Sequence, residues 1–153
     1  MLISSIALLE IWGRSSLPLA ENIMVKRDRN ITFNPNDDIS YVIQTLSKKN
    51  ISGAPVVDLE DKIIGIVSEL DIIELVKKSE IENRGIEFIE KMKVSEIMMK
   101  DIITASPKAT LTDLVSYMSK KDVNRIPIVD KHKKLLGLVT RDDLLRGIYN
   151  QIE

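Results

Sequence analysis

The chain has 153 residues, of which 44% are hydrophobic and 29% are charged, and its formal net charge is −1 at pH 7. This composition is typical of one globular domain or of two small ones that share a core, and it excludes a disordered chain. The near-neutral charge gives no general attraction to nucleic acid or membranes. Because cysteine is absent, disulfides and thiolate metal sites are excluded, and we expect a reducing, cytoplasmic setting.

Residues 1–19 form an N-terminal apolar segment that starts MLISSIALLEIW. The run is shorter than the roughly 20 apolar residues of a transmembrane span, and it lacks a clear basic start and cleavage site of a signal peptide. We therefore expect a short helix that packs on the body or on a second subunit, with no transmembrane span. A surface anchor is disfavoured because no lysine or arginine precedes Arg14.

An internal repeat occupies most of the chain. Residues 31–73 align without a gap with residues 103–145, and AENIM at 20–24 matches VSEIM at 94–98, with two extra residues in the first copy's loop. Such self-similarity indicates a duplicated structural unit. We therefore divide the chain into the apolar segment 1–19, repeat 1 at 20–78, a connecting segment at 79–93 and repeat 2 at 94–153.

Each repeat predicts five elements in chain order. Short strands at 30–33 and 102–105 end at Pro35 and Pro107, and amphipathic helices follow at 37–50 and 110–122, with Asp37 and Thr110 as N-caps. Two apolar runs around a polar turn predict hairpins at 54–67 and 126–139, followed by helices at 68–78 and 140–152. The connecting segment favours helix, broken at Gly85.

The predicted fold class is therefore α+β, or mixed α/β. Tandem β-α-β-β-α repeats carry small mixed sheets, in which the β-α-β part is parallel and right-handed and the hairpin is antiparallel. One repeat of about 60 residues is marginal alone, so we expect the two to pack about a pseudo-two-fold axis.

The duplicated motif resembles a known family. The pattern x-G/R-h-P-h-h-D…G-h-h-S/T-x-x-D, with h apolar, occurs twice and resembles the cystathionine-β-synthase (CBS) domain pair, or stand-alone Bateman module, over roughly residues 18–153. The resemblance implies two clefts between the repeats and a homodimer of stacked pairs. It also implies a regulatory function: binding AMP, ADP, ATP or S-adenosylmethionine and signalling to a partner protein that the sequence does not name.

Two strand-to-helix corners are the candidate ribose sites. Thr140 ends a strand and Asp143 lies in the next helical turn, where a carboxylate can accept hydrogen bonds from the two ribose hydroxyls. Ser68 and Asp71 occupy the same places in repeat 1. Gly137 is expected to leave room for close backbone approach. The same T-x-x-D and S-x-x-D patterns also describe ordinary helix caps, which is the favoured interpretation until the resemblance is added.

Arg125 is the main difference between the copies, because Gly53 stands at its place in repeat 1. In the family that the chain resembles, a basic residue here often reaches ligand phosphates, and a guanidinium grips phosphate oxygens well. Arg141 and Lys121 could add charge. Repeat 2 should therefore prefer a phosphorylated adenosine, whereas repeat 1 should bind weakly, bind an uncharged adenosine compound or stay empty. The alternative is an exposed arginine at a strand start.

An apolar slot for adenine would need residues near the same strands. The candidates are Ile126, Ile128 and Leu138 in repeat 2, Ala54, Val56 and Ile66 in repeat 1, and Thr32 and Thr104 at the first strand ends. For most of the apolar ones, ordinary core packing is the competing interpretation.

Other classes of function fit less well. No nucleophile–base pair or phosphate-cradling glycine loop points to an enzyme, and the single histidine, His132, is expected to be a turn residue rather than a metal ligand. Basic clusters are interleaved with acids and aromatic residues are few, which disfavours nucleic acid. A ligand-free oligomerisation module remains open. If the sensor interpretation holds, Asp143→Ala should weaken adenosine binding with little loss of fold.

Overall fold

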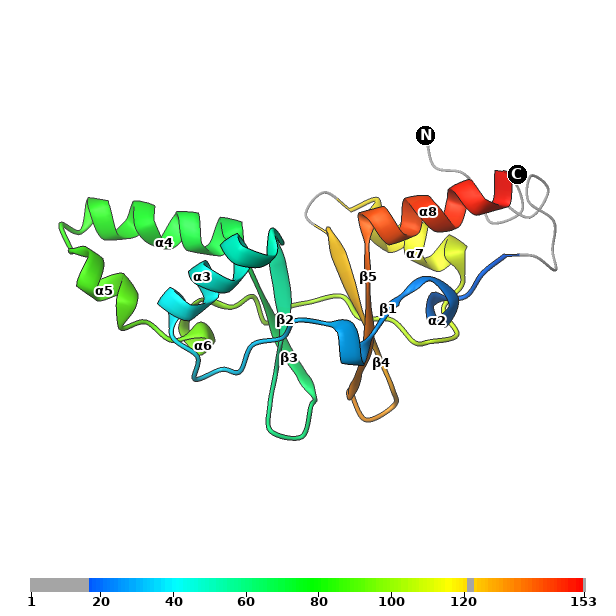
Figure 1. Ribbon diagram of the computed structural model, residues 1–153, viewed down its shortest axis with the longest axis horizontal. Coiled ribbons are helices and arrows are strands. Elements are labelled where there is room, and N and C mark those ends of the chain that lie inside the picture. The colour runs from blue at the N-terminus through cyan, green and yellow to red at the C-terminus, as the bar shows by residue number, and fades with distance from the viewer. Residues whose placement is uncertain (1–16, 121–122, 153) are drawn as a thin grey trace. The chain divides into compact units, whose positions relative to one another are not determined.

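The computed structural model describes residues 17–120 and 123–152 (Figure 1). The chain separates into two compact units: unit 1 combines Met1–Asn30 with Ile103–Glu153, and unit 2 is Ile31–Ile102. The predicted N-terminal helix lies almost wholly outside the described residues.

Unit 2 contains most of repeat 1, from Ile31 on, and a short antiparallel sheet of two strands. Its elements are α3 (Ile39–Lys49), β2 (Gly53–Val57), β3 (Ile63–Ser68), α4 (Glu69–Ile81), α5 (Ile86–Glu90) and α6 (Val94–Ile97). The predicted hairpin is confirmed as β2–β3. Gly85 separates α4 from α5, as the sequence predicted.

Unit 1 contains most of repeat 2, from Ile103 on, and a three-stranded antiparallel sheet of order β1-β5-β4. Its elements are α2 (Ala20–Ile23), β1 (Val25–Lys26), the 3₁₀ turn η1 (Arg27–Arg29), α7 (Leu111–Met118), β4 (Arg125–Val129), β5 (Leu135–Thr140) and α8 (Arg141–Ile152). Helices and small sheets occur in both units, so the α+β class is confirmed.

The two strands predicted to open the repeats are reduced to single parallel bridges, Phe33 to Val56 and Ala105 to Ile128. The facing strands each carry a proline, Pro55 or Pro127, which has no N–H to donate. The Phe33 N–H donates to the Pro55 carbonyl, and the Val57 N–H donates back to the Phe33 carbonyl. The parallel sense is as predicted, and the prolines limit its length.

The first residues of each repeat, 20–30 in repeat 1 and 94–102 in repeat 2, belong to the unit that contains the rest of the other repeat. In unit 1 the Ala20 N–H donates to the Ala109 carbonyl at 2.8 Å, and β1 runs beside β5 (Figure 1). In unit 2 the Val94 N–H donates to the Asp37 carbonyl at 3.0 Å. The boundaries of the compact units therefore lie about ten residues after the starts of the sequence repeats, at 30/31 and 102/103.

Helix starts follow the predicted polar residues with one exception. Thr110 caps α7, since its hydroxyl accepts from the Asp113 N–H at 3.1 Å. The assignment of Asp37 as the α3 cap was wrong by one residue, because Asp38 holds that position. The Asp37 carboxylate instead accepts a hydrogen bond from the Asn34 N–H at 2.8 Å, which closes the turn after the Phe33–Val56 bridge.

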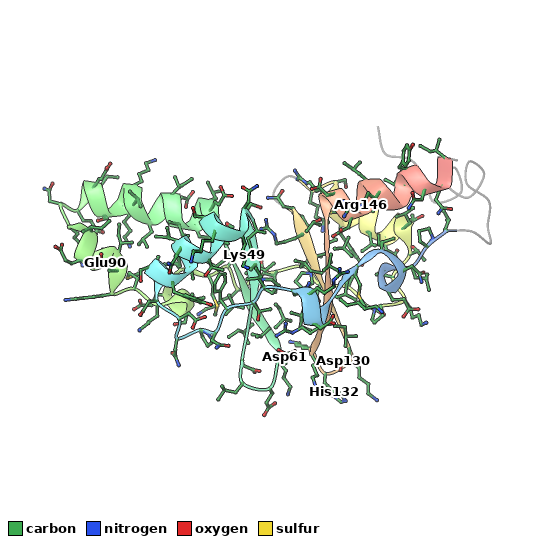
Figure 2. All side chains as sticks on the ribbon, in the orientation of Figure 1. Lys49, Asp61, Glu90, Asp130, His132 and Arg146 are labelled. Atoms are coloured by element: carbon green, nitrogen blue, oxygen red, sulfur yellow. The ribbon has the colours of Figure 1, made fainter. Side chains whose placement is uncertain are left out.

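The hairpin turns explain the aspartate of the repeated motif. Asp130 Oδ1 accepts from the backbone N–H groups of His132 (2.8 Å) and Lys134 (2.9 Å). Figure 2 shows Asp130 and His132 at the far end of the hairpin from α8. The hydrogen bond from Lys134, with a smaller contribution from His132, lowers the pKa of Asp130. His132 is thus an exposed turn residue, as expected.

Each unit has its own apolar core. In unit 2 the core gathers around Phe33, Val42 and Val67, all almost fully buried. In unit 1 it gathers around Leu114, Ile128 and Val139. Alternate residues of β3 and β5 face these cores, which is the burial pattern of a sheet covered on one side.

Gly137 lies where β1, near the start of repeat 1, pairs with β5. A Cβ at Gly137 would be 2.6 Å from Met24 Sδ and 2.7 Å from the Val25 carbonyl oxygen. Gly65 meets Met98 Sδ and the Met99 carbonyl oxygen in the same way in unit 2. The close backbone approach expected at Gly137 is therefore made by the chain's own β1.

Gly137→Ala should lower the free energy of unfolding by about 1–3 kcal/mol, because the added methyl group forces β1 away from β5. Urea denaturation of wild type and variant measures this difference. Gly85→Ala is the control, since a Cβ there meets only the flexible Glu87 carboxylate. Equal stability of Gly137→Ala and wild type would contradict the packing described.

Candidate functional site

The corner between β5 and α8 joins Thr140 to Asp143. The Thr140 backbone N–H donates to Asp143 Oδ2 at 2.8 Å, and the Thr140 hydroxyl donates to the same oxygen at 2.9 Å. Asp143 lies in the first turn of α8, where a carboxylate is also favoured by the helix dipole. The capping interpretation of T-x-x-D is therefore realised in the structure.

Asp143 is a buried carboxylate with a charged partner. Its side chain is 4% exposed, and Arg146 Nη2 donates to Asp143 Oδ1 at 2.6 Å. Arg146 itself is 69% exposed and reaches the carboxylate from the next turn of α8. Asp143 Oδ2 is therefore held by Thr140 at the strand end, and Asp143 Oδ1 faces the exposed guanidinium of Arg146.

The equivalent corner of unit 2 joins Ser68 to Asp71. The Ser68 N–H and hydroxyl donate to Asp71 Oδ2 at 2.8 and 3.1 Å. The geometry repeats that of unit 1, but Asp71 is only half-buried, and Glu74 stands at the place of Arg146. The two corners therefore share a scaffold and differ in charge.

Arg125 lies beside the unit 1 corner. It opens β4 and is the direct cross-strand partner of Thr140, just as Gly53 is of Ser68. Arg141, the first residue of α8, is exposed, and its N–H donates to the Asn124 carbonyl at 3.2 Å. The structure thus brings Arg125, Thr140 and Asp143 to one edge of unit 1, whereas Lys121 lies outside the described residues.

The residues considered for an adenine slot fall into two groups. Four are almost fully buried in the two cores: Ile126, Ile128, Ala54 and Val56. Four are half-buried: Leu138, Ile66, Thr32 and Thr104. Leu138 pairs with Val25 of β1, and Ile66 bridges to Met99. The half-buried group is the one that retains surface for contact with a base.

A cavity of about 430 Å³ opens beside Asp143 in unit 1. It lies between one face of α8 and the segment formed by α2, β1 and η1. Its lining is Asn22, Ile23, Met24, Val25, Lys26, Arg29, Asp143, Arg146, Gly147 and Asn150. Of these, the repeated motif pointed only to Asp143. Two features of the sequence could have pointed to the other lining residues. One is the pair of extra residues in the first copy's loop, where η1 forms, and the other is the difference between Arg146 and its equivalent Glu74.

The CBS domain family model matches residues 20–78 and 94–150. Because these two matches cover most of the chain, it belongs to the CBS domain family and carries two copies of the domain. The resemblance expected from the repeated motif is confirmed.

Curated relatives share this pair. Uncharacterized protein MJ1426 of Methanocaldococcus jannaschii is 32% identical over 157 residues, which cover 85% of this chain and 90% of that protein. Uncharacterized protein MJ1232 of the same organism is 36% identical over 146 residues, covering 95% of this chain. This chain spans only 45% of MJ1232, and only 21% of the organism's inosine-5′-monophosphate dehydrogenase, to which it is 32% identical.

Solved structures have the same fold. The CBS domain pair of protein MJ0100, in complex with 5-methylthioadenosine and S-adenosyl-L-methionine, has a TM-score of 0.70 and 28% identity, covering 88% of this chain and 98% of that one. CBSX2 in complex with AMP has a TM-score of 0.76 and 22% identity, covering 87% and 97%. The second likeness concerns the fold alone.

Two further findings concern only residues 17–120 and 123–152. None of the helices there combines the length and apolarity that crossing a membrane requires. The histidine, aspartate and glutamate side chains in these ranges form no group of three or more that could hold a metal ion.

The structure changes one expectation about Asp143. Because its carboxylate is buried and holds the start of α8, Asp143→Ala should lower the free energy of unfolding by about 1–3 kcal/mol rather than leave the fold untouched. Asp71→Ala should cost less, since Asp71 is half-buried. Urea denaturation compares the two. A loss for Asp143→Ala no larger than that for Asp71→Ala would contradict the role of burial.

Proposed function

We propose that this chain is a regulatory module that binds an adenosine-containing ligand at the unit 1 corner and passes the signal to a partner protein. The observation that carries the proposal is the Thr140–Asp143 corner. Its carboxylate is held by the strand end through Oδ2, and it is flanked by Arg125 on the neighbouring strand. A fixed carboxylate suits a vicinal diol, because two hydroxyl donors can share its oxygens in charge-assisted hydrogen bonds.

Asp143 and Thr140 bind the ribose in this proposal. The Arg146 guanidinium already occupies Asp143 Oδ1 from the solvent side, so the ribose hydroxyl shares that oxygen with it or replaces it. Since Arg146 is mostly exposed, its displacement costs little packing. Leu138 and Thr104, the residue before the Ala105 bridge, offer half-buried surface for the base.

Arg125 and Arg141 bind the phosphate. Both lie next to Thr140, one across the strand pair and one along the chain. AMP, ADP and ATP fit this arrangement through their phosphates. In unit 2, where Gly53 and Glu69 stand at the equivalent places, Ser68 and Asp71 suit an adenosine compound without phosphate, such as S-adenosylmethionine, with Ile66 and Thr32 near the base.

The known complexes support a ligand of this class. The CBS pair of MJ0100, 28% identical to this chain, was solved with 5-methylthioadenosine and S-adenosyl-L-methionine. The family supports a regulatory rather than a catalytic role. We further propose a cytoplasmic homodimer built from stacked pairs.

A second function, protein association without a ligand, is favoured by one surface. A groove of about 380 Å³ between α3 and α4 is lined by five apolar residues, Ile43, Leu46, Ile51, Ile72 and Ile73, and by the polar residues Ser47, Asn50 and Glu69. An exposed apolar groove of this kind marks an interaction site in many proteins. The two functions are compatible, since a sensor needs both a ligand and a surface that reports its binding.

Calorimetric titration with AMP and adenosine tests the ligand assignment. Arg125→Gln should weaken AMP binding about tenfold or more while adenosine changes by less than about twofold, because only AMP loses a charge-assisted contact. Lys77→Gln, an exposed cation on α4, is the control for net charge. Equal losses for both ligands, or none, would reject Arg125 as the phosphate residue, and absence of binding in wild type would reject the sensor.

A further inference from the structure

Helix α8 carries a row of exposed apolar side chains, called here the α8 row. Leu145, Tyr149 and Ile152 are 62%, 59% and 70% exposed, and their spacing of four and then three residues places them on one side of the helix. The opposite side of α8 is buried through Leu144 and Gly147. A surface helix normally turns polar side chains to solvent, so a second apolar side indicates a second contact.

The equivalent helix of unit 2 does not carry a continuous row of this kind. At the three equivalent places α4 has Ile73, Lys77 and Glu80, so two of the three side chains are charged. Both charged side chains are exposed, as on an ordinary solvated helix face. The continuous row therefore belongs to unit 1 rather than to the repeated fold, and we expect the segment that covers it to be specific to unit 1.

The described part of the chain begins within that same unit. Leu17 is half-buried and packs against the core of unit 1. Ile23 of α2 packs against α8, since its Cγ2 lies 3.2 Å from where a Cβ at Gly147 would be. Residues 1–16, which lie outside the described residues, are therefore attached directly to the unit that carries the α8 row.

The sequence of residues 2–12 matches the α8 row in character, spacing and length. Leu2, Ile6 and Leu9 repeat the spacing of four and then three residues, so they share one face of the helix expected there. Eleven helical residues extend about 16 Å, whereas the α8 row is about 10 Å long from its first residue to its last. A helix of this length can therefore cover the whole row.

Residues 13–16 are long enough to connect two packed helices. Their sequence, GRSS, ends the apolar run and favours a turn. Four extended residues span about 13 Å, which exceeds the roughly 8–10 Å between the axes of packed helices. A short flexible linker also gives a tethered segment an effective concentration on the order of millimolar, which favours contact within one chain over contact with a second copy.

We propose that residues 2–12 form a helix whose apolar face docks on the α8 row of the same chain. The contact removes both apolar rows from water, which the hydrophobic effect favours. While the segment is docked, this side of α8 is closed to other proteins, and displacement of the segment exposes an apolar face that another protein can contact. The inference does not depend on an adenosine ligand, because neither row includes the Thr140–Asp143 corner.

Paired cysteine substitutions test the contact, since the chain contains no cysteine of its own. Ile6 and Tyr149 are the middle members of the two rows, so they meet whether the helices run parallel or antiparallel. Mild oxidation of full-length Ile6→Cys/Tyr149→Cys should give a disulfide within one chain, seen as a cross-linked monomer on a non-reducing gel. Ile6→Cys/Lys77→Cys, which uses the equivalent place in α4, is the matched control and should form little disulfide.

Three outcomes of the cross-linking overturn the proposal. A covalent dimer in place of the cross-linked monomer would show that a second copy covers the α8 row. Absence of a disulfide would show that the segment does not reach the row. Equal cross-linking in the Lys77→Cys control would show that the contact is not specific to α8.

Trp12, the only tryptophan of the chain, gives a second readout. It lies one turn beyond Leu9 and leaves water when the segment docks, so its emission in wild type should lie at shorter wavelength than in the urea-unfolded chain. Tyr149→Glu should shift the emission towards the unfolded value, whereas Tyr149→Phe, which keeps an apolar ring, should not. Ile73→Glu, at the place of Leu145 in α4, is the control for an added carboxylate.

The emission can also contradict docking on α8. Equal emission in wild type and Tyr149→Glu would show that Trp12 does not depend on the α8 row. A shift as large for Ile73→Glu would place the segment against the α3–α4 groove, which Ile73 lines. Either result overturns the proposal.

Discussion

The hydrogen bonds between a strand end and a helix-start carboxylate organise both units. Asp143 and Asp71 each accept from the backbone N–H and the hydroxyl of the residue three positions earlier. This contact ends the strand, starts the helix and holds one carboxylate oxygen, so the other oxygen is directed by the backbone rather than by a free rotamer. Such pre-orientation increases the affinity of a carboxylate for a diol, because less side-chain entropy is lost on binding.

Each unit contains the first residues of the other repeat, 20–30 or 94–102, so each unit depends on a distant part of the chain. Strand β1 reaches β5 only because Gly137 has no side chain there, and α2 is tied to the loop before α7. The cavity wall that carries Lys26 and Arg29 is therefore supplied by residues that precede repeat 1's first bridge, while Asp143 comes from repeat 2. A substitution at Gly137 can therefore displace the β1 wall of the cavity, although Gly137 does not line the cavity itself.

Much of the fold follows from local sequence pattern. The hairpins, the Thr140–Asp143 corner and the break at Gly85 rest on contacts within a few residues, which explains why apolar periodicity and capping patterns predict them. The packing of each repeat's first residues in the other unit could not be predicted from local pattern. Alignment of the repeats pairs residues that are similar in sequence, whereas the folded chain joins Ala20 to Ala109 of the other repeat. Arg29 and Arg146 could not be predicted for the same reason, since their common cavity exists only after β1 has paired with β5.

The central claim is that Asp143 recognises the two adjacent hydroxyls of a ribose. The affinity of AMP compared with that of 2′,3′-dideoxy-AMP tests it most directly, since the two ligands share base and phosphate and differ only in those hydroxyls. We expect the dideoxy ligand to bind at least about tenfold more weakly, from the loss of charge-assisted hydrogen bonds to a fixed carboxylate. Equal affinities would show that the carboxylate serves only to start α8.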